Sequence, residues 1–96
     1  MSTPTTTTTI ATLRAEIEQL DQSLIDLIAR RQELARAMAC AKQEAGLPVV
    51  DLAREAAVVR AAATHARGAH LDEEALRHIF WCLIDLSRRA QLDAQS

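Results

Sequence analysis

Two cationic side chains occupy positions where a helical pattern places apolar ones. Residues 24, 28, 31, 35, 38 and 42 recur at steps of three and four, and they read Leu, Ile, Arg, Ala, Met and Lys. On one helix, Arg31 and Lys42 point within about 20° of one another and lie about 16 Å apart along the axis. Because both side chains are long, their charged ends either close on a small anion between them or extend from the stripe into water.

Further polar side chains share helix faces in the C-terminal half of the chain. Ser87 and Gln91 stand four residues apart on one face, which reflects either a binding site or an apolar stripe that frays at its end. Asp51, Arg54 and Glu55 fall within one helical turn. Capping and dipole chemistry are the expected explanation of such a trio, and ligand binding is the alternative.

Arg14 is a candidate of a different kind. It lies about 25 Å before Arg31 along a helix axis and about 100° around it, so the two cannot serve one pocket from the same helix. Arg14 reaches such a pocket only from an antiparallel second copy, or it is a solvated residue of the first turn. Together, the inward Arg, Lys, Gln, Ser and Glu side chains can bind a small dianion and polarise a neutral oxygen. It offers no nucleophile and no well-placed base, so a reaction here needs only positioning and electrostatics.

Three helices must position these residues. Apolar residues recur at helical spacing over 10–45, a stretch without Gly or Pro, until Gly46 ends it. A second helix is predicted over about 52–66, and a third over about 73–92 behind the N-cap Asp72. The fold class is therefore all-α, with one long, one short and one medium helix.

The long helix predicts a partner chain. A helix of about 35 residues is about 50 Å long, whereas a compact chain of this size is only about 30–35 Å across. The apolar stripe therefore continues beyond the globule, and we expect a second copy to cover it in a homodimer. The Thr-rich residues 1–9 are expected to be a disordered tail, and residues 10–96 a single helical domain.

Composition excludes several classes of function. A net charge of -2 gives no basic field for nucleic acid, and one Trp, one Phe and no Tyr give no base-stacking platform. No apolar run approaches the length of about 18 residues that a membrane span needs, and no signal peptide is visible. Cys40 and Cys82 form no metal or redox motif, and the histidines lack metal-ligand spacing. We expect a reduced, cytoplasmic protein with both cysteines as small core residues and no metal.

Four segments in register carry a family resemblance. They are LRAEIEQLDQSLIDLIARRQELA at 13–35, AxAK at 39–42, LPVVDLARE at 47–55 and the pair Ser87-x-x-x-Gln91. Over residues 10–92 the chain resembles the all-helical, AroQ-type chorismate mutases. The resemblance implies an intertwined homodimer with two active sites, each completed by the long helix of the partner. It also implies a cofactor-free Claisen rearrangement of chorismate to prephenate, in the shikimate pathway of aromatic amino acid biosynthesis.

By matching positions, the resemblance implies how the dianionic substrate is held. Arg31 and Arg14 of the partner subunit would hold its two carboxylates, with Arg54 and Ser87 assisting. The enolpyruvyl arm must fold over the ring, and fixing both carboxylates solves much of that orientation problem.

The same matching implies the catalytic set. Lys42 and Gln91 would donate to the ether oxygen, on which negative charge grows as the C–O bond breaks, and Arg31 completes the set. One well-placed donor of this kind contributes about 3–4 kcal/mol, and modest enzymatic acceleration needs about 8 kcal/mol. Glu55, with the Asp51 region, would bind the ring hydroxyl. A neutral Gln at position 91 predicts little sensitivity to acid.

The sequence leaves other functions open. The same fold can serve a 4-amino-4-deoxychorismate mutase, an isochorismate-pyruvate lyase or a non-catalytic helical dimerisation module. Glu55 and Asp51 favour a mutase over the lyase, but one carboxylate serves a ring hydroxyl or a ring amine. The adjacent residues Arg88 and Arg89 depart from the family pattern. Arg88 could alter the pocket mouth, although a solvated face is the expectation.

Overall fold

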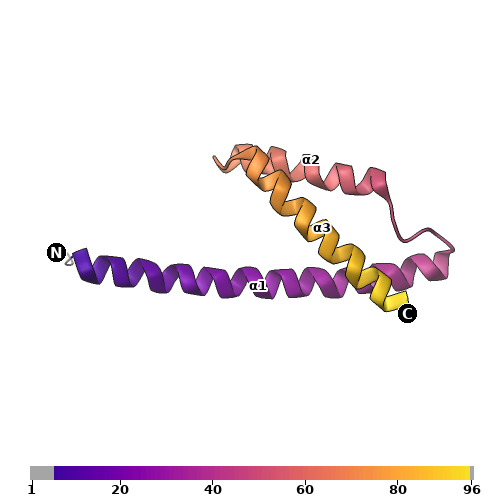
Figure 1. Ribbon diagram of the computed structural model, residues 1–96, viewed down its shortest axis with the longest axis horizontal. Helices are drawn as coiled ribbons and strands as arrows, with labels where there is room; N and C mark the ends of the chain where they lie inside the picture. The colour runs from indigo at the N-terminus through magenta and orange to yellow at the C-terminus, as the bar shows by residue number, and fades with distance from the viewer. Residues whose placement is uncertain (1–5, 96) are drawn as a thin grey trace. The chain divides into compact units, whose positions relative to one another are not determined.

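The computed structural model describes the backbone of residues 6–95 and the side chains of residues 9–94. The described residues form three α-helices and no β-strand: α1 (Thr6–Ala45), α2 (Leu52–Gly68) and α3 (Glu73–Gln95), as Figure 1 shows. The predicted all-α class and the order of a long, a short and a medium helix are confirmed. The chain divides into two units inside α1, the first ending at Arg30 and the second beginning at Arg31.

The start of α1 differs from the prediction. The helix begins at Thr6, so Thr6–Thr9 are helical and the expected boundary at residue 10 moves toward the N-terminus. Threonine is a poor helix former, but its cost is below about 0.7 kcal/mol per residue, and extending an existing helix avoids the cost of nucleation. The disorder expected for residues 1–5 lies outside the described residues.

The other end of α1 is as predicted. Gly46 has a φ of 70°, the left-handed conformation that glycine adopts without a steric penalty, and it ends the helix. The Leu47 N–H donates to the Lys42 carbonyl at 2.8 Å, and the Gly46 N–H donates to the Gln43 carbonyl at 3.1 Å. Lys42 therefore stands in the last turn of α1, beside the loop that leads to α2.

Carboxylate caps begin both shorter helices. Asp51 accepts a hydrogen bond from the backbone N–H of Arg54 at 3.0 Å, and Asp72 accepts one from that of Glu74 at 3.0 Å. Both predicted N-caps are confirmed. They matter for the site because Asp51 fixes where α2 starts and hence where its first turn lies.

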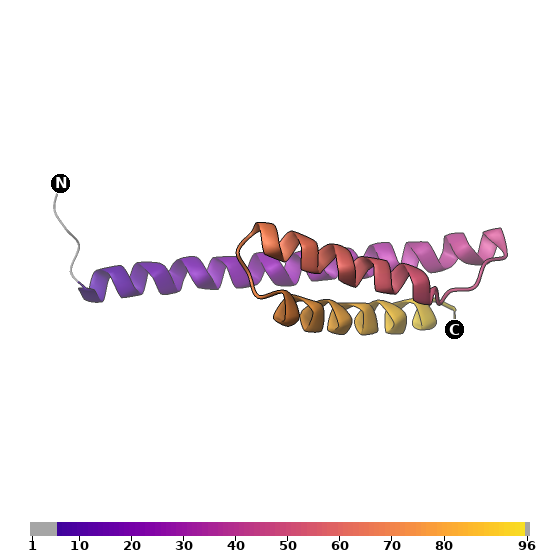
Figure 2. The ribbon, with the colours of Figure 1, turned by 90° about the horizontal axis from the view of Figure 1, so that it is seen from above.

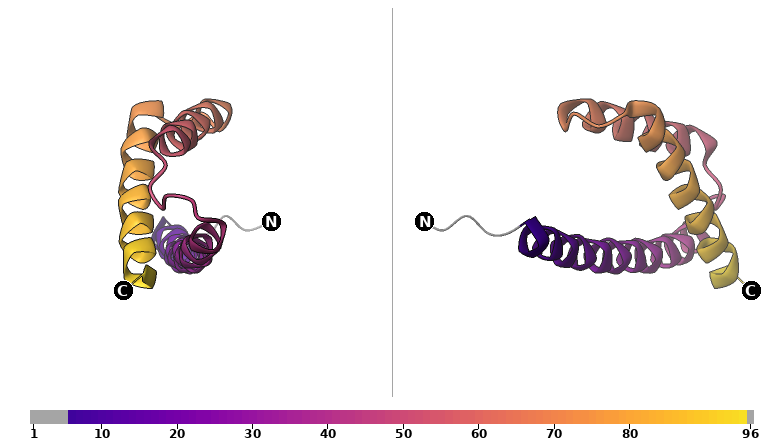
Figure 3. Two further views of the ribbon diagram at one scale, coloured as in Figure 1. Left: turned by 90° about the vertical axis from the view of Figure 1, so that its right-hand side faces the viewer. Right: turned by 60° about the vertical axis from the view of Figure 1, so that its left-hand side comes forward.

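Small side chains build the core of the second unit. Its buried apolar residues are Ala35, Ala39, Val59, Ala62, Ala63, Ala66, Ile84 and Ala90. Helices α2 and α3 leave a common turn and pack against each other (Figure 2). The C-terminal half of α3 crosses the part of α1 that follows Arg31 (Figure 3), and there the Gln32 side chain donates to the Leu86 carbonyl at 3.0 Å. Between α2 and α3, small alanine side chains let the two helices approach closely, although each alanine buries little area.

Several residues of the expected apolar stripe are not in this core. Leu34 and Met38 are 54% and 51% exposed, while the alanines that follow each of them are buried. Adjacent positions on a helix are 100° apart, so the alanine face that meets the other helices lies beside the leucine face. The expectation that Cys40 and Cys82 fill the core is wrong, because both are exposed in this chain.

The described part of the first unit is a helix with a large apolar surface. Its exposed large apolar side chains are Ile10, Leu13, Ile17, Leu20, Leu24, Ile25 and Leu27. Most of them recur at steps of three and four, which gathers them on one face. Monomeric proteins rarely expose so continuous an apolar face. Over the described residues, no helix combines the length and hydropathy needed to cross a bilayer.

Candidate active site

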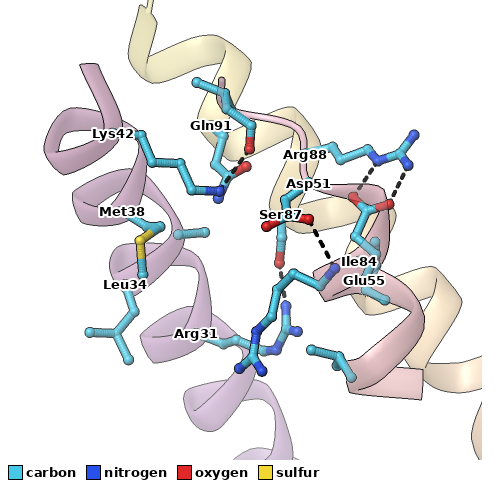
Figure 4. Close-up of a pocket in the computed structure, with 14 residues that line it drawn as sticks. Arg31, Leu34, Met38, Lys42, Asp51, Glu55, Ile84, Ser87, Arg88 and Gln91 are labelled. Carbon is cyan, nitrogen blue, oxygen red and sulfur yellow. Dashed lines mark hydrogen bonds and ion pairs between the residues drawn. The ribbon is translucent and has the colours of Figure 1, made fainter. Parts of the chain in front are cut away.

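A cavity of about 490 Å³ lies within the second unit, bounded by the end of α1, the start of α2 and the C-terminal half of α3 (Figure 4). Seven of the eight predicted site residues line it: Arg31, Lys42, Asp51, Arg54, Glu55, Ser87 and Gln91. The eighth, Arg14, is an exposed residue of the first unit and is not among the lining residues. The end of α1, the start of α2 and the C-terminal half of α3 thus bring seven of the predicted site residues to one cavity.

Arg31 is held against α3. Its Nη1 donates to the Ser87 hydroxyl and, at 3.4 Å, to the Leu83 carbonyl, while the Ser87 hydroxyl itself donates to that carbonyl at 3.0 Å. A guanidinium carries five N–H donors, so Nε and the other terminal nitrogen of Arg31 keep donors for a ligand. Ser87 therefore positions Arg31 at the cavity.

Lys42 enters the cavity from the last turn of α1. Its Nζ donates to the Val49 carbonyl at 2.8 Å, which ties the amine to the loop before α2. An ammonium has three donors, so two remain for a ligand. Gln91 lines the same cavity from α3 (Figure 4), and its side chain is half-buried. Lys42 and Gln91 thus bring N–H donors to the cavity from two different helices.

Arg88 is a cavity residue for which the sequence favoured a solvated face and left an effect on the pocket mouth as the alternative. It lines the cavity and contacts Glu55 through two nitrogens. Its Nε donates to Oε2 of Glu55 at 2.6 Å, and its Nη2 donates to Oε1. The spacing of Ile84, Arg88 and Gln91 was the available signal, because steps of four and three place them on one helix face.

This ion pair sets the protonation of Glu55. The Glu55 side chain is only 13% exposed, against 39% for Arg88. The hydrogen bonds from Arg88 lower the pKa of Glu55 below its ordinary value, and burial opposes them. The same hydrogen bonds raise the pKa of Arg88. Glu55 is therefore a carboxylate at neutral pH.

The charges around the cavity favour a small dianion. Four cationic side chains and two carboxylates line it, a formal excess of two positive charges. Apolar side chains such as Leu34, Met38 and Val58 complete the wall and suit an organic ring. Neither His nor Cys lines the cavity, and among the described residues no group of three His, Cys, Asp or Glu side chains could hold a metal ion.

A comparison with protein families identifies the group to which these features belong. The family described as chorismate mutase type II matches residues 13–92. The chain belongs to the type II chorismate mutase family. A search of curated protein sequences finds no significant match.

Membership of the type II chorismate mutase family confirms the resemblance that the sequence segments carry. The match extends from the residue before Arg14 to the residue after Gln91, so every predicted site residue falls inside it. The family match gives the membership of the chain, and the structure adds that Arg88 lines the cavity and contacts Glu55.

Proposed function

We propose that the chain catalyses the cofactor-free rearrangement of chorismate to prephenate, as an isomerase. The observation that carries the proposal is the convergence of Arg31, Lys42 and Gln91 on one cavity in a chorismate mutase family member. In this Claisen rearrangement the ether C–O bond breaks as a C–C bond forms within one molecule. Such a reaction needs orientation and charge stabilisation, and it requires no nucleophile or proton transfer.

Arg31 supplies the first part of the mechanism by binding a substrate carboxylate. The Ser87 hydroxyl and the Leu83 carbonyl hold its guanidinium in place before the substrate arrives. Arg54, at the exposed edge of the cavity, adds positive charge. A pre-positioned guanidinium fixes a carboxylate by paired hydrogen bonds, which restrains the enolpyruvyl arm over the ring.

Lys42 and Gln91 supply the second part. Negative charge grows on the ether oxygen in the transition state, and both side chains carry N–H donors that can face it. The Lys42 ammonium is held by the Val49 carbonyl, so little reorganisation is needed when the charge develops. Each such donor contributes about 3–4 kcal/mol when it is well placed.

A second copy of the chain completes the proposed enzyme. The exposed apolar face of the first unit, which includes Leu13, Ile17 and Leu20, needs a cover that the described chain does not supply. In an intertwined homodimer this face becomes an interface, and Arg14 of the partner subunit binds the second carboxylate. Each of two active sites then contains residues of both chains.

The test is an assay of the purified chain with chorismate, 4-amino-4-deoxychorismate and isochorismate, each followed by product analysis. We expect prephenate from chorismate with the highest kcat/KM of the three. Pyruvate release from isochorismate would instead identify a lyase. An absence of turnover with all three compounds would contradict an enzymatic function and favour a helical binding module.

A further inference from the structure

Both oxygens of the Glu55 carboxylate are already engaged by the protein. Arg88 reaches from α3 to α2 and contacts Oε2 through Nε at 2.6 Å and Oε1 through Nη2 (Figure 4). Both side chains line the cavity, and the carboxylate is largely shielded from water. A ligand in the cavity therefore meets Glu55 as one half of an ion pair and not as an isolated negative charge.

A paired carboxylate keeps its capacity to accept hydrogen bonds. The two oxygens of a carboxylate offer about four acceptor sites, and Arg88 occupies one on each oxygen. A hydroxyl group on a bound ring can thus still donate to Glu55. What Arg88 removes is the net charge, and a cationic amine depends on that charge for its binding.

The other nearby charges do not restore a negative field. Asp51 and Lys42 are the remaining charged groups that act on Glu55, and they act in opposite directions. The lining side chains together carry a formal excess of two positive charges. A dianion with a neutral ring substituent balances this excess, whereas an ammonium on the ring meets additional cations.

We propose that Arg88 makes the cavity selective for a substrate whose ring carries a neutral hydroxyl over one that carries a cationic amine. This inference rests on the proposed function, and it resolves the choice between hydroxyl and amine that the lone Glu55 left open. Arg88 is a specificity-determining residue that acts through Glu55. It keeps the carboxylate oriented as an acceptor and cancels its charge.

The neighbouring arginine provides a matched control. Arg89 pairs with Asp85 on its own helix at 2.8 Å, is 71% exposed and does not line the cavity. Arg88→Met removes the charge and the two contacts while keeping an unbranched side chain. Arg88→Lys keeps the charge beside Glu55, and Arg89→Met removes an arginine from the same segment without touching the cavity.

The experiment measures kcat/KM for chorismate and for 4-amino-4-deoxychorismate with each variant. We expect the unmodified chain to prefer chorismate by at least about tenfold, because like charges placed together weaken binding. Arg88→Met should move the ratio toward the amine by at least about tenfold, and Arg88→Lys and Arg89→Met by less than about threefold. A purely structural role would lower both values together and leave the ratio unchanged, which would overturn the proposal.

Two further measurements separate the possible failures. A preference of the unmodified chain for the amine overturns the proposal even if Arg88→Met does not fold. If the unmodified chain turns over neither compound, the proposed function fails, and calorimetry with the same two compounds gives the ratio of their Kd values. A chorismate preference that Arg88→Met abolishes supports the selectivity, whereas binding of neither compound overturns both proposals.

Discussion

Up to Arg30, α1 displays a face of large apolar side chains, whereas from Arg31 onward the same helix buries alanines and directs cations into a cavity. The apolar period is the same in both parts. In the first part, Leu13, Leu20 and their apolar neighbours are exposed. These side chains carry no polar group that could bind or polarise a substrate. In the second part, Arg31 and Lys42 interrupt the period and both line the cavity.

Interruptions in an apolar stripe thus carry more functional information than the stripe itself. A regular stripe only indicates that something covers it. A cation in the stripe must either reach water or face an anion, because burying an unpaired charge is costly. Arg31 and Lys42, the two cations that interrupt the stripe of α1, both lie at one cavity.

The largest effect is expected from removing a cation of the second part. Lys42→Ala should lower kcat/KM for chorismate by at least about a hundredfold, because it deletes a donor to the ether oxygen. Steady-state kinetics measure the change. Arg36→Ala is the matched control, since Arg36 is an exposed residue of α1 outside the cavity lining. A loss below about threefold for Lys42→Ala would remove this residue from the mechanism.

The next largest effect is expected at Arg14, which we propose binds a substrate carboxylate in the active site of a partner chain. Arg14→Ala should lower kcat/KM by at least about tenfold, because one carboxylate loses its anchor. Mixing Arg14→Ala chains with Arg31→Ala chains should restore severalfold activity over either alone, since a heterodimer then has one intact site. Intact dimers that fail to complement would show that the sites are not shared.

A smaller effect on kcat/KM, which depends on pH, is expected at Gln91, on the α3 side of the cavity. Gln91→Glu replaces an amide that always donates by a carboxyl that donates only when protonated. Its kcat/KM should rise by at least about tenfold between about pH 7 and pH 5, whereas that of the unmodified chain should stay within about threefold. A flat profile for Gln91→Glu would mean that Gln91 does not face the reacting oxygen.

The smallest expected effect concerns the contribution of the Arg88–Glu55 ion pair to stability. Because Arg88 lowers the pKa of Glu55 below its ordinary value of 4.5, the pair stabilises the fold above that value. This contribution is lost as the pH falls through the lower pKa of the folded state. The difference in Tm between the unmodified chain and Arg88→Met should therefore be larger at neutral pH than in acid. A difference that does not depend on pH would argue against the pair in solution.

Local patterns in the sequence determined most of the fold. The helical period, the caps Asp51 and Asp72 and the stop at Gly46 are properties of short segments, and the structure confirms each of them. Spacing alone also brought Arg31 and Lys42 to one face. The position of α1's first residue was less predictable, because weak helix formers extend a stable helix at little cost.

Only the tertiary structure decided which faces meet. Periodicity identifies a face of a helix but not what packs against it, so the burial of Ala35 and Ala39 beside exposed leucines required the packed helices. The pairing of Arg88 with Glu55 joins residues far apart in the sequence, and no local rule predicts which cation a carboxylate will meet. Such a contact depends on how α2 and α3 cross, which long-range packing determines.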